Sequence, residues 1–99
     1  MDTVNVAIAG ATGAVGEVMR EILEEREFPV DKLSLLASER SAGTRLQYAG
    51  SSIEVEDLDQ FDFSDTQVAL FSAGGSVSAK YAPKAASQGC VVIDNTSYF

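Results

Sequence analysis

Ninety-nine residues, 45% of them hydrophobic and 22% charged, suffice for one small folded domain, and this composition argues against a disordered chain. The net charge of −8 argues against nucleic acid and acidic membrane surfaces as partners, because both repel a negatively charged protein. One cysteine, Cys90, and no histidine exclude a disulfide framework and any metal site that needs two cysteine or histidine ligands. The first residues lack a basic segment and the first apolar run is too short for a membrane span, so we expect a soluble cytoplasmic protein.

A glycine-rich turn follows the first predicted strand, which covers residues 4–9. Gly10, Gly13 and Gly16 have the spacing G-x-x-G-x-x-G and lead into an amphipathic helix that ends near residue 26. Glycine lets the backbone approach a ligand closely, and the unpaired amides at the start of a helix attract phosphate. We therefore interpret the turn as a nucleotide phosphate site; the alternative is a purely structural strand-to-helix turn. The helix carries one apolar stripe, formed by Val15, Val18, Met19, Ile22 and Leu23.

A second predicted strand, residues 33–37, runs into a polar segment that bears on the choice of nucleotide. Domains that prefer NAD usually place an acid about 20 residues after the glycine motif, where it holds the ribose 2′-hydroxyl. Here Arg40 offers a guanidinium to a 2′-phosphate, and Ser38 and Ser41 offer hydroxyls, which favours NADP. Glu39 complicates this hypothesis because an acid there could bind the ribose; we expect its side chain to point outward. The alternative for Arg40 is a surface arginine paired with an acid.

The middle of the chain changes character. Residues 45–48 and 52–56 alternate around a turn, which predicts a small inserted β-hairpin that decorates the fold without chemistry of its own. Residues 57–65 are acidic with a few apolar anchors, and we interpret them as a packed connector.

The last third of the chain returns to alternating strand and helix. A strand over residues 67–71 precedes a helix over 77–88, for which Ser76 is a candidate N-cap. Pro83 requires that this helix start late or carry a kink. A final strand covers residues 90–93.

This order predicts an α/β fold: a Rossmann-like, doubly wound, mostly parallel sheet with the inserted hairpin, in one domain over residues 1–99. Ligands of such sheets lie beyond the carboxyl ends of the strands, and all four predicted parallel strands end in small or polar residues. Cys90 has no histidine to activate it, so we interpret it as a buried structural cysteine and not as a nucleophile. Asp94 is interpreted as a loop residue and not as a base. The sequence therefore predicts a binding domain without catalytic groups of its own.

Four ordered motifs resemble a known family. They are Gly10-Ala11-Thr12-Gly13-Ala14-Val15-Gly16, Leu36-Ala37-Ser38-Glu39-Arg40-Ser41-Ala42-Gly43, Phe71-Ser72-Ala73-Gly74-Gly75 and Val92-Ile93-Asp94-Asn95-Thr96-Ser97. The chain resembles, over nearly its whole length, the N-terminal portion of the bacterial aspartate-β-semialdehyde dehydrogenases. That resemblance implies NADP(H) as cofactor and, in the full-length enzyme, reductive dephosphorylation of aspartyl 4-phosphate to L-aspartate 4-semialdehyde and phosphate. This step feeds lysine, diaminopimelate, threonine, methionine and isoleucine biosynthesis.

The resemblance also implies cofactor-binding residues. The glycine loop holds the phosphates in that family, which maps to Thr12, Gly13, Ala14 and Val15, with Gly10 opening the turn. The segment that holds the adenosine ribose and its 2′-phosphate maps to Ser38, Arg40 and Ser41. The later strand ends map to Ser72, Ala73 and Gly74 further along the cofactor, and to Asn95 and Thr96 near its nicotinamide.

The family's catalytic cysteine and histidine, its substrate-binding arginines and its dimer-forming domain match nothing in these residues. We therefore expect a cofactor domain that is inactive alone and belongs to a homo-oligomeric enzyme. Two alternatives remain open: an enzyme similar to the N-acetylglutamyl-phosphate reductases, and a non-catalytic dinucleotide-binding or sensor module.

Overall fold

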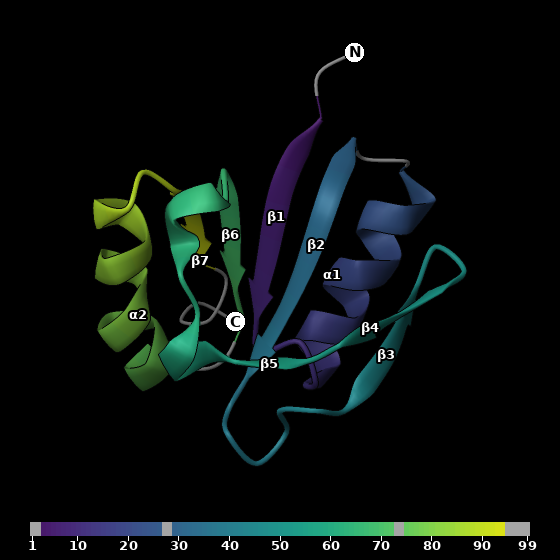
Figure 1. Cartoon of the computed structure of the whole chain (residues 1–99), viewed down its shortest axis with the longest axis horizontal. Coiled ribbons are helices and arrows are strands. Elements are labelled where there is room, and N and C mark those ends of the chain that lie inside the picture. The colour runs from purple at the N-terminus through teal and green to yellow at the C-terminus, as the bar shows by residue number, and fades with distance from the viewer. Residues whose placement is uncertain (1–2, 27–28, 73–74, 95–99) are drawn as a thin grey trace.

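The computed structural model describes residues 3–26, 29–72 and 75–94 (Figure 1). A parallel sheet with the strand order β5-β2-β1-β6-β7 forms its centre, and a separate antiparallel hairpin joins β3 and β4. The strands are β1 (Val4–Ala9), β2 (Val30–Ala37), β3 (Arg45–Tyr48), β4 (Ser51–Glu54), β5 (Glu56–Asp57), β6 (Val68–Phe71) and β7 (Val91–Asp94). The helices are α1 (Ala14–Glu25) and α2 (Gly75–Ser87), with 3-10 turns η1 (Leu58–Gln60) and η2 (Phe63–Asp65). The predicted α/β architecture is confirmed.

Each face of the sheet has its own core because side chains alternate along the strands. On one face, Ala7 and Ala9 of β1 pack with residues of α2, η1 and η2, including fully buried Phe63. On the other face, Val6 and Ile8 of β1 pack with α1 and with the hairpin. Figure 1 shows α1 and α2 on opposite sides of the sheet, which is the doubly wound arrangement.

The direction of winding reverses beside β1, the central strand. Register pairs Ile8 with Leu35 of β2 on one side and with Leu70 of β6 on the other. A crevice at the carboxyl ends of the strands, where the strand order reverses, is the usual ligand position in such sheets. We therefore expect the ligand site at the edge of the sheet where β1, β2 and β6 end.

The connector after the hairpin supplies a fifth strand that the sequence did not predict. Residues 52–56 were expected to form one strand, but β4 ends at Glu54 and β5 begins at Glu56. Between them, Val55 is buried and its amide donates to the carbonyl of Thr44 at 2.7 Å, while its carbonyl accepts from the amide of Gly43 at 2.8 Å. These bonds turn the chain so that β5 pairs with the last two residues of β2. The hairpin thus places η1 beside the carboxyl end of β2.

Two further expectations about helices are corrected. Helix α2 begins at Gly75, so Ser76 lies inside its first turn and is not the N-cap, and the helix runs through Pro83 without a late start. Proline cannot donate the backbone hydrogen bond that a helix needs at position 83. The helix nevertheless continues, because its packing against the sheet compensates for this loss: Ala85, two residues later, is fully buried. In α1, Leu23 is buried but Val18 and Ile22 are about half exposed, so only part of the apolar stripe contacts the sheet.

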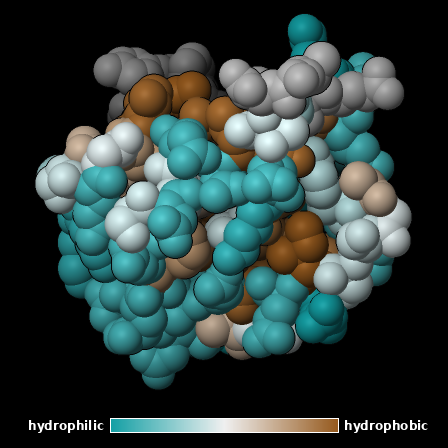
Figure 2. Space-filling view, turned by 45° about the horizontal axis from the view of Figure 1, so that its top comes forward, coloured by the Kyte–Doolittle hydropathy of each residue, from teal (hydrophilic) through white to brown (hydrophobic). Residues whose placement is uncertain are grey.

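The face seen in Figure 2 is largely hydrophilic, with hydrophobic areas interrupting it. In the part of the chain that the structure describes, neither helix has the length and apolar character needed to cross a membrane.

Candidate functional site

Each of the three glycines in the turn has a different structural role. Gly10 has φ +86°, a conformation that side chains disfavour, and its amide donates to the carbonyl of Leu36 at 2.8 Å. Gly13 is the N-cap of α1 and its amide donates to the carbonyl of Gly10 at 3.0 Å. Gly16 packs against the turn so closely that an added Cβ would lie 2.8 Å from Cα of Ala11. The start of α1, formed by Ala14 and Val15, is therefore held directly over the ends of β1 and β2.

A cavity of about 550 Å³ opens at this edge of the sheet. Several of the predicted site residues line it: Gly10, Thr12, Gly13, Ser38 and Ser72. Further lining residues were not predicted as site residues: Ala37, Glu39, Asp57, Leu58, Asp59, Lys80 and Tyr81. The structure thus brings three strand ends together in one cavity and adds a wall from η1 and α2.

Ser72 ties the end of β6 to the glycine turn. Its hydroxyl donates to the carbonyl of Ala9 at 3.0 Å, and its amide donates to the same carbonyl at 2.9 Å. Two bonds to one carbonyl fix the hydroxyl oxygen at the cavity, where it still has an acceptor lone pair for a ligand.

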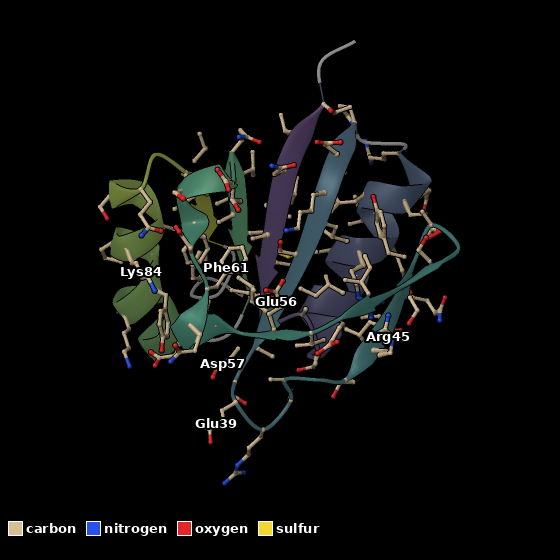
Figure 3. All side chains as sticks on the ribbon, viewed as in Figure 1. Glu39, Arg45, Glu56, Asp57, Phe61 and Lys84 are labelled. Carbon is tan, nitrogen blue, oxygen red and sulfur yellow. The ribbon has the colours of Figure 1, made fainter. Side chains whose placement is uncertain are left out.

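The segment after β2 forms a tight turn, and only some of its residues line the cavity. The amides of Ser41 and Ala42 donate to the carbonyl of Ser38 at 2.9 and 3.1 Å. Glu39 is among the residues that line the cavity and is exposed on the turn, where Figure 3 labels it, and its outward direction from a bound ligand stays a prediction. Arg40 and Ser41 are not among the lining residues of this cavity.

The wall from η1 and α2 is a linked group of side chains. Asp57 accepts from the amide of Asp59 at 2.9 Å and so caps η1. Asp59 in turn accepts from the hydroxyl of Tyr81 at 2.7 Å and lies 3.8 Å from Nζ of Lys80. A side-chain hydrogen bond with Tyr81, followed by the charges of Tyr81 and Asp59, raises the pKa of Lys80. The Asp-x-Asp spacing could have predicted the cap, but Lys80 and Tyr81 carry no local pattern that points to a site.

Cys90 lies away from the cavity, in the core beneath α2. It is buried among Ala85, Phe63 and their neighbours, and burial raises the pKa of its thiol, so the thiolate is disfavoured. The interpretation as a structural cysteine agrees with this position. Within residues 3–26, 29–72 and 75–94, no group of three acidic, cysteine or histidine side chains could hold a metal ion.

Four of the predicted cofactor residues, Ala73, Gly74, Asn95 and Thr96, lie outside the described residues.

A family model described as the semialdehyde dehydrogenase NAD-binding domain matches residues 5–99. Aspartate-semialdehyde dehydrogenase 2 of Vibrio cholerae is 62% identical over 95 residues, which cover 96% of this chain and 28% of the relative. The corresponding enzyme of Bacillus subtilis is 50% identical, again over 96% of this chain and 28% of the relative. The chain therefore spans less than a third of the length of these relatives.

Solved structures agree with the sequence relatives. The crystal structure of Vibrio cholerae aspartate-semialdehyde dehydrogenase II complexed with ASA superposes with a TM-score of 0.95 at 60% identity, covering 99% of this chain and 32% of that one. A probable aspartate-semialdehyde dehydrogenase of Pseudomonas aeruginosa gives 0.91 at 49% identity, covering 94% and 28%. The Candida albicans enzyme, solved with NADP, gives 0.74 over 97% of this chain and 30% of that one; its 20% identity shows the fold alone.

The resemblance seen in four sequence motifs is confirmed by these matches, and the glycine turn and the cavity lie where a dinucleotide-binding sheet holds its ligand. The chain belongs to the semialdehyde dehydrogenase family, as its NAD-binding domain.

Proposed function

We propose that this chain is the NADP-binding domain of an aspartate-semialdehyde dehydrogenase. The whole enzyme would convert aspartyl 4-phosphate and NADPH to L-aspartate 4-semialdehyde, phosphate and NADP. The catalytic cysteine and histidine would come from outside these 99 residues, and the enzyme would be a cytoplasmic homo-oligomer. The observation that carries the cofactor assignment is the cavity that joins the glycine turn to the ends of β2 and β6.

The pyrophosphate of the cofactor fits the glycine turn. Gly10 and Gly13 line the cavity without side chains, and the first amides of α1 lie at the positive end of the helix dipole. The backbone can therefore donate several hydrogen bonds to the phosphate oxygens without rearrangement.

The charge of the cavity wall bears on where a 2′-phosphate would lie. Glu39, Asp57 and Asp59 line the cavity and Lys80 is its one lining cation among the described residues, so a phosphate inside would meet excess negative charge. Arg40 stands outside, on the exposed side of the turn, and none of the ion pairs between described residues includes it. We infer that the ribose hydroxyls face the carboxylates while the 2′-phosphate projects outward to Arg40, Ser38 and Ser41.

Titration with NADP and with NAD tests this arrangement. The chain should bind NADP more tightly, and Arg40→Ala should weaken NADP binding about tenfold or more while leaving NAD affinity unchanged, because a charged hydrogen-bond partner of the 2′-phosphate is lost. Arg45→Ala is the matched control: Arg45 pairs with Glu54 and with the hydroxyl of Ser52 on the hairpin, away from the cavity (Figure 3).

Equal affinities for NADP and NAD, or an Arg40→Ala variant with unchanged NADP affinity, would remove the 2′-phosphate assignment. The isolated chain should give no dehydrogenase turnover, and measurable turnover would contradict the proposal that the reacting groups come from elsewhere.

A further inference from the structure

The hairpin of β3 and β4 is attached to both elements that carry the proposed phosphate contacts. At its base, the carbonyl of Val55 accepts from the amide of Gly43 at 2.8 Å, and the amide of Val55 donates to the carbonyl of Thr44 at 2.7 Å. Along its length, the carbonyl of Gln47 on β3 accepts a hydrogen bond from Nη1 of Arg20 on α1 at 2.9 Å. The hairpin therefore connects α1, whose first residues follow the glycine turn, with the turn after β2 that we propose for the 2′-phosphate.

Side chains of α1 and β3 lie together beside the hydrogen bond from Arg20 (Figure 1). Leu46 and Tyr48 of β3 are half-buried against the core on the α1 side of the sheet. Burial, followed by the charge of Glu24, raises the pKa of Tyr48. Glu24 lies four residues after Arg20 and so on the same side of the helix. Nε of Arg20 is buried and has no partner among the described residues, so the bond from Nη1 to Gln47 is the one that holds the guanidinium against the hairpin.

The turn over residues 38–43 depends on such support because packing does not fix it. Its residues are exposed, apart from half-buried Ser41. Backbone hydrogen bonds hold it and lead into the hairpin: the amide of Ser41 donates to the carbonyl of Ser38, and the amide of Thr44 donates to the carbonyl of Ser41 at 3.1 Å. A contact made from a loop is only as precise as the residues that support the loop. We propose that Arg20, acting through the hairpin, is a positioning residue for the turn that meets the 2′-phosphate, and so sustains the preference for NADP over NAD. This inference rests on the proposed cofactor function.

Arg20→Met tests the role of the guanidinium. Methionine keeps an apolar side chain on α1 but cannot donate to Gln47. NADP affinity should fall about threefold to tenfold, the size of effect expected when one link of a coupled network is removed. NAD affinity should stay unchanged, because NAD has no 2′-phosphate for the turn to hold.

Arg26→Met is the matched control on the same helix. Arg26 is the exposed C-cap of α1, and none of the side-chain hydrogen bonds or ion pairs between described residues includes it. The substitution removes the same charge and should leave both affinities unchanged. Arg45→Ala should also keep the preference for NADP, since Arg45 bonds across the hairpin to Ser52 and Glu54 and at neither of its attachments.

Hydrogen exchange of the wild-type protein tests the inference without a substitution. Coupling between two sites is reciprocal, so a bound 2′-phosphate should stabilise the base of the hairpin as the hairpin stabilises the turn. At equal saturation, NADP should slow exchange of the Gly43 and Val55 amides more than NAD does, and Arg20→Met should abolish that difference. Equal protection by the two dinucleotides in the wild-type protein would overturn the inference.

The affinities provide further outcomes that contradict it. Loss of NADP and NAD affinity by the same factor in Arg20→Met would show a merely structural role, and an equal effect of Arg26→Met would show that the charge of α1 is the cause. If Arg40→Ala abolishes the preference for NADP but Arg20→Met does not change it, the positioning inference fails and the cofactor assignment stands. If the wild-type protein does not prefer NADP, the 2′-phosphate assignment fails and the positioning inference fails with it. Urea unfolding of each variant identifies any substitution that acts through loss of the fold.

Discussion

Gly16 is the residue at which the glycine turn depends on close packing. An added Cβ would lie 2.8 Å from Cα of Ala11, a backbone atom that cannot move aside, so Gly16→Ala forces α1 away from the turn. We expect a loss of about 2–3 kcal/mol in the free energy of unfolding, near the upper end of overpacking effects. A decrease in the free energy of unfolding would identify the close packing as the cause, because alanine inside a helix otherwise stabilises it by about 1 kcal/mol relative to glycine. Urea unfolding measures the change.

Gly13→Ala provides the control for that substitution. At Gly13 the nearest atom to an added Cβ is the carbonyl oxygen of Gly10 at 3.5 Å, an ordinary contact. The loss should stay within about 1 kcal/mol, which reflects the weaker N-cap preference of alanine. Equal losses in the two variants would show that the close packing against Ala11 is not the cause.

At the scale of single residues, the sequence predicted where the backbone needs glycine better than it predicted which side chains contact one another. The spacing of Gly10, Gly13 and Gly16 predicted a sharp turn that leads into a helix, because glycine permits backbone geometry that other residues disfavour. The contribution of Tyr81 to the cavity wall was not predicted, because its hydroxyl bonds to Asp59, which is 22 residues away in sequence.

Pro83 is the weak point of helix α2. The helix runs from Gly75 to Ser87, and Pro83 within it cannot donate a hydrogen bond to the preceding turn. Because Pro83 is exposed, alanine fits there without new contacts, and Pro83→Ala should raise the free energy of unfolding by about 1–3 kcal/mol. For a domain of this size each kcal/mol corresponds to a rise of about 4–8 °C in Tm.

Ala86→Gly, at an exposed position of the same helix, is the control for the proline substitution. It should lower the free energy of unfolding by about 1 kcal/mol if this part of α2 is helical in the native state. A Pro83→Ala variant with unchanged or lower stability would mean that the proline fits the local geometry without loss.

At the scale of elements, the long apolar strands and both helices followed from hydrophobic periodicity. The sequence did not predict β5, because two residues are too few to carry a strand pattern and their pairing with β2 depends on the turn at Val55. This missed strand matters for function, since it carries Asp57 and leads into Asp59. The start of α2 was misplaced because Ser76 matches an N-cap pattern, whereas the helix already begins at Gly75.

The two edges of the sheet differ in how they are protected, and this difference concerns the whole molecule. At one edge β5 is only two residues long, which leaves little backbone open to pairing. At the other edge β7 runs over four residues, and Val91 and Ile93 on the same side of the strand are 61% and 50% exposed. Among the described residues no strand pairs with the outer edge of β7, and an edge strand that also exposes apolar side chains promotes pairing with another chain. We therefore expect the isolated domain to self-associate through β7.

The double substitution Val91→Thr and Ile93→Thr should shift the chain toward monomer in sedimentation velocity experiments over a range of protein concentrations. Threonine is β-branched, so the strand should persist while its apolar surface is lost. Val18→Thr with Ile22→Thr is the control, because these side chains are also about half exposed but lie on the helix α1 and not on a strand edge. If the α1 pair lowers association as much as the β7 pair, general apolar exposure and not the sheet edge drives it. Cofactor affinity should be unchanged in both double variants, since none of the four residues lines the cavity.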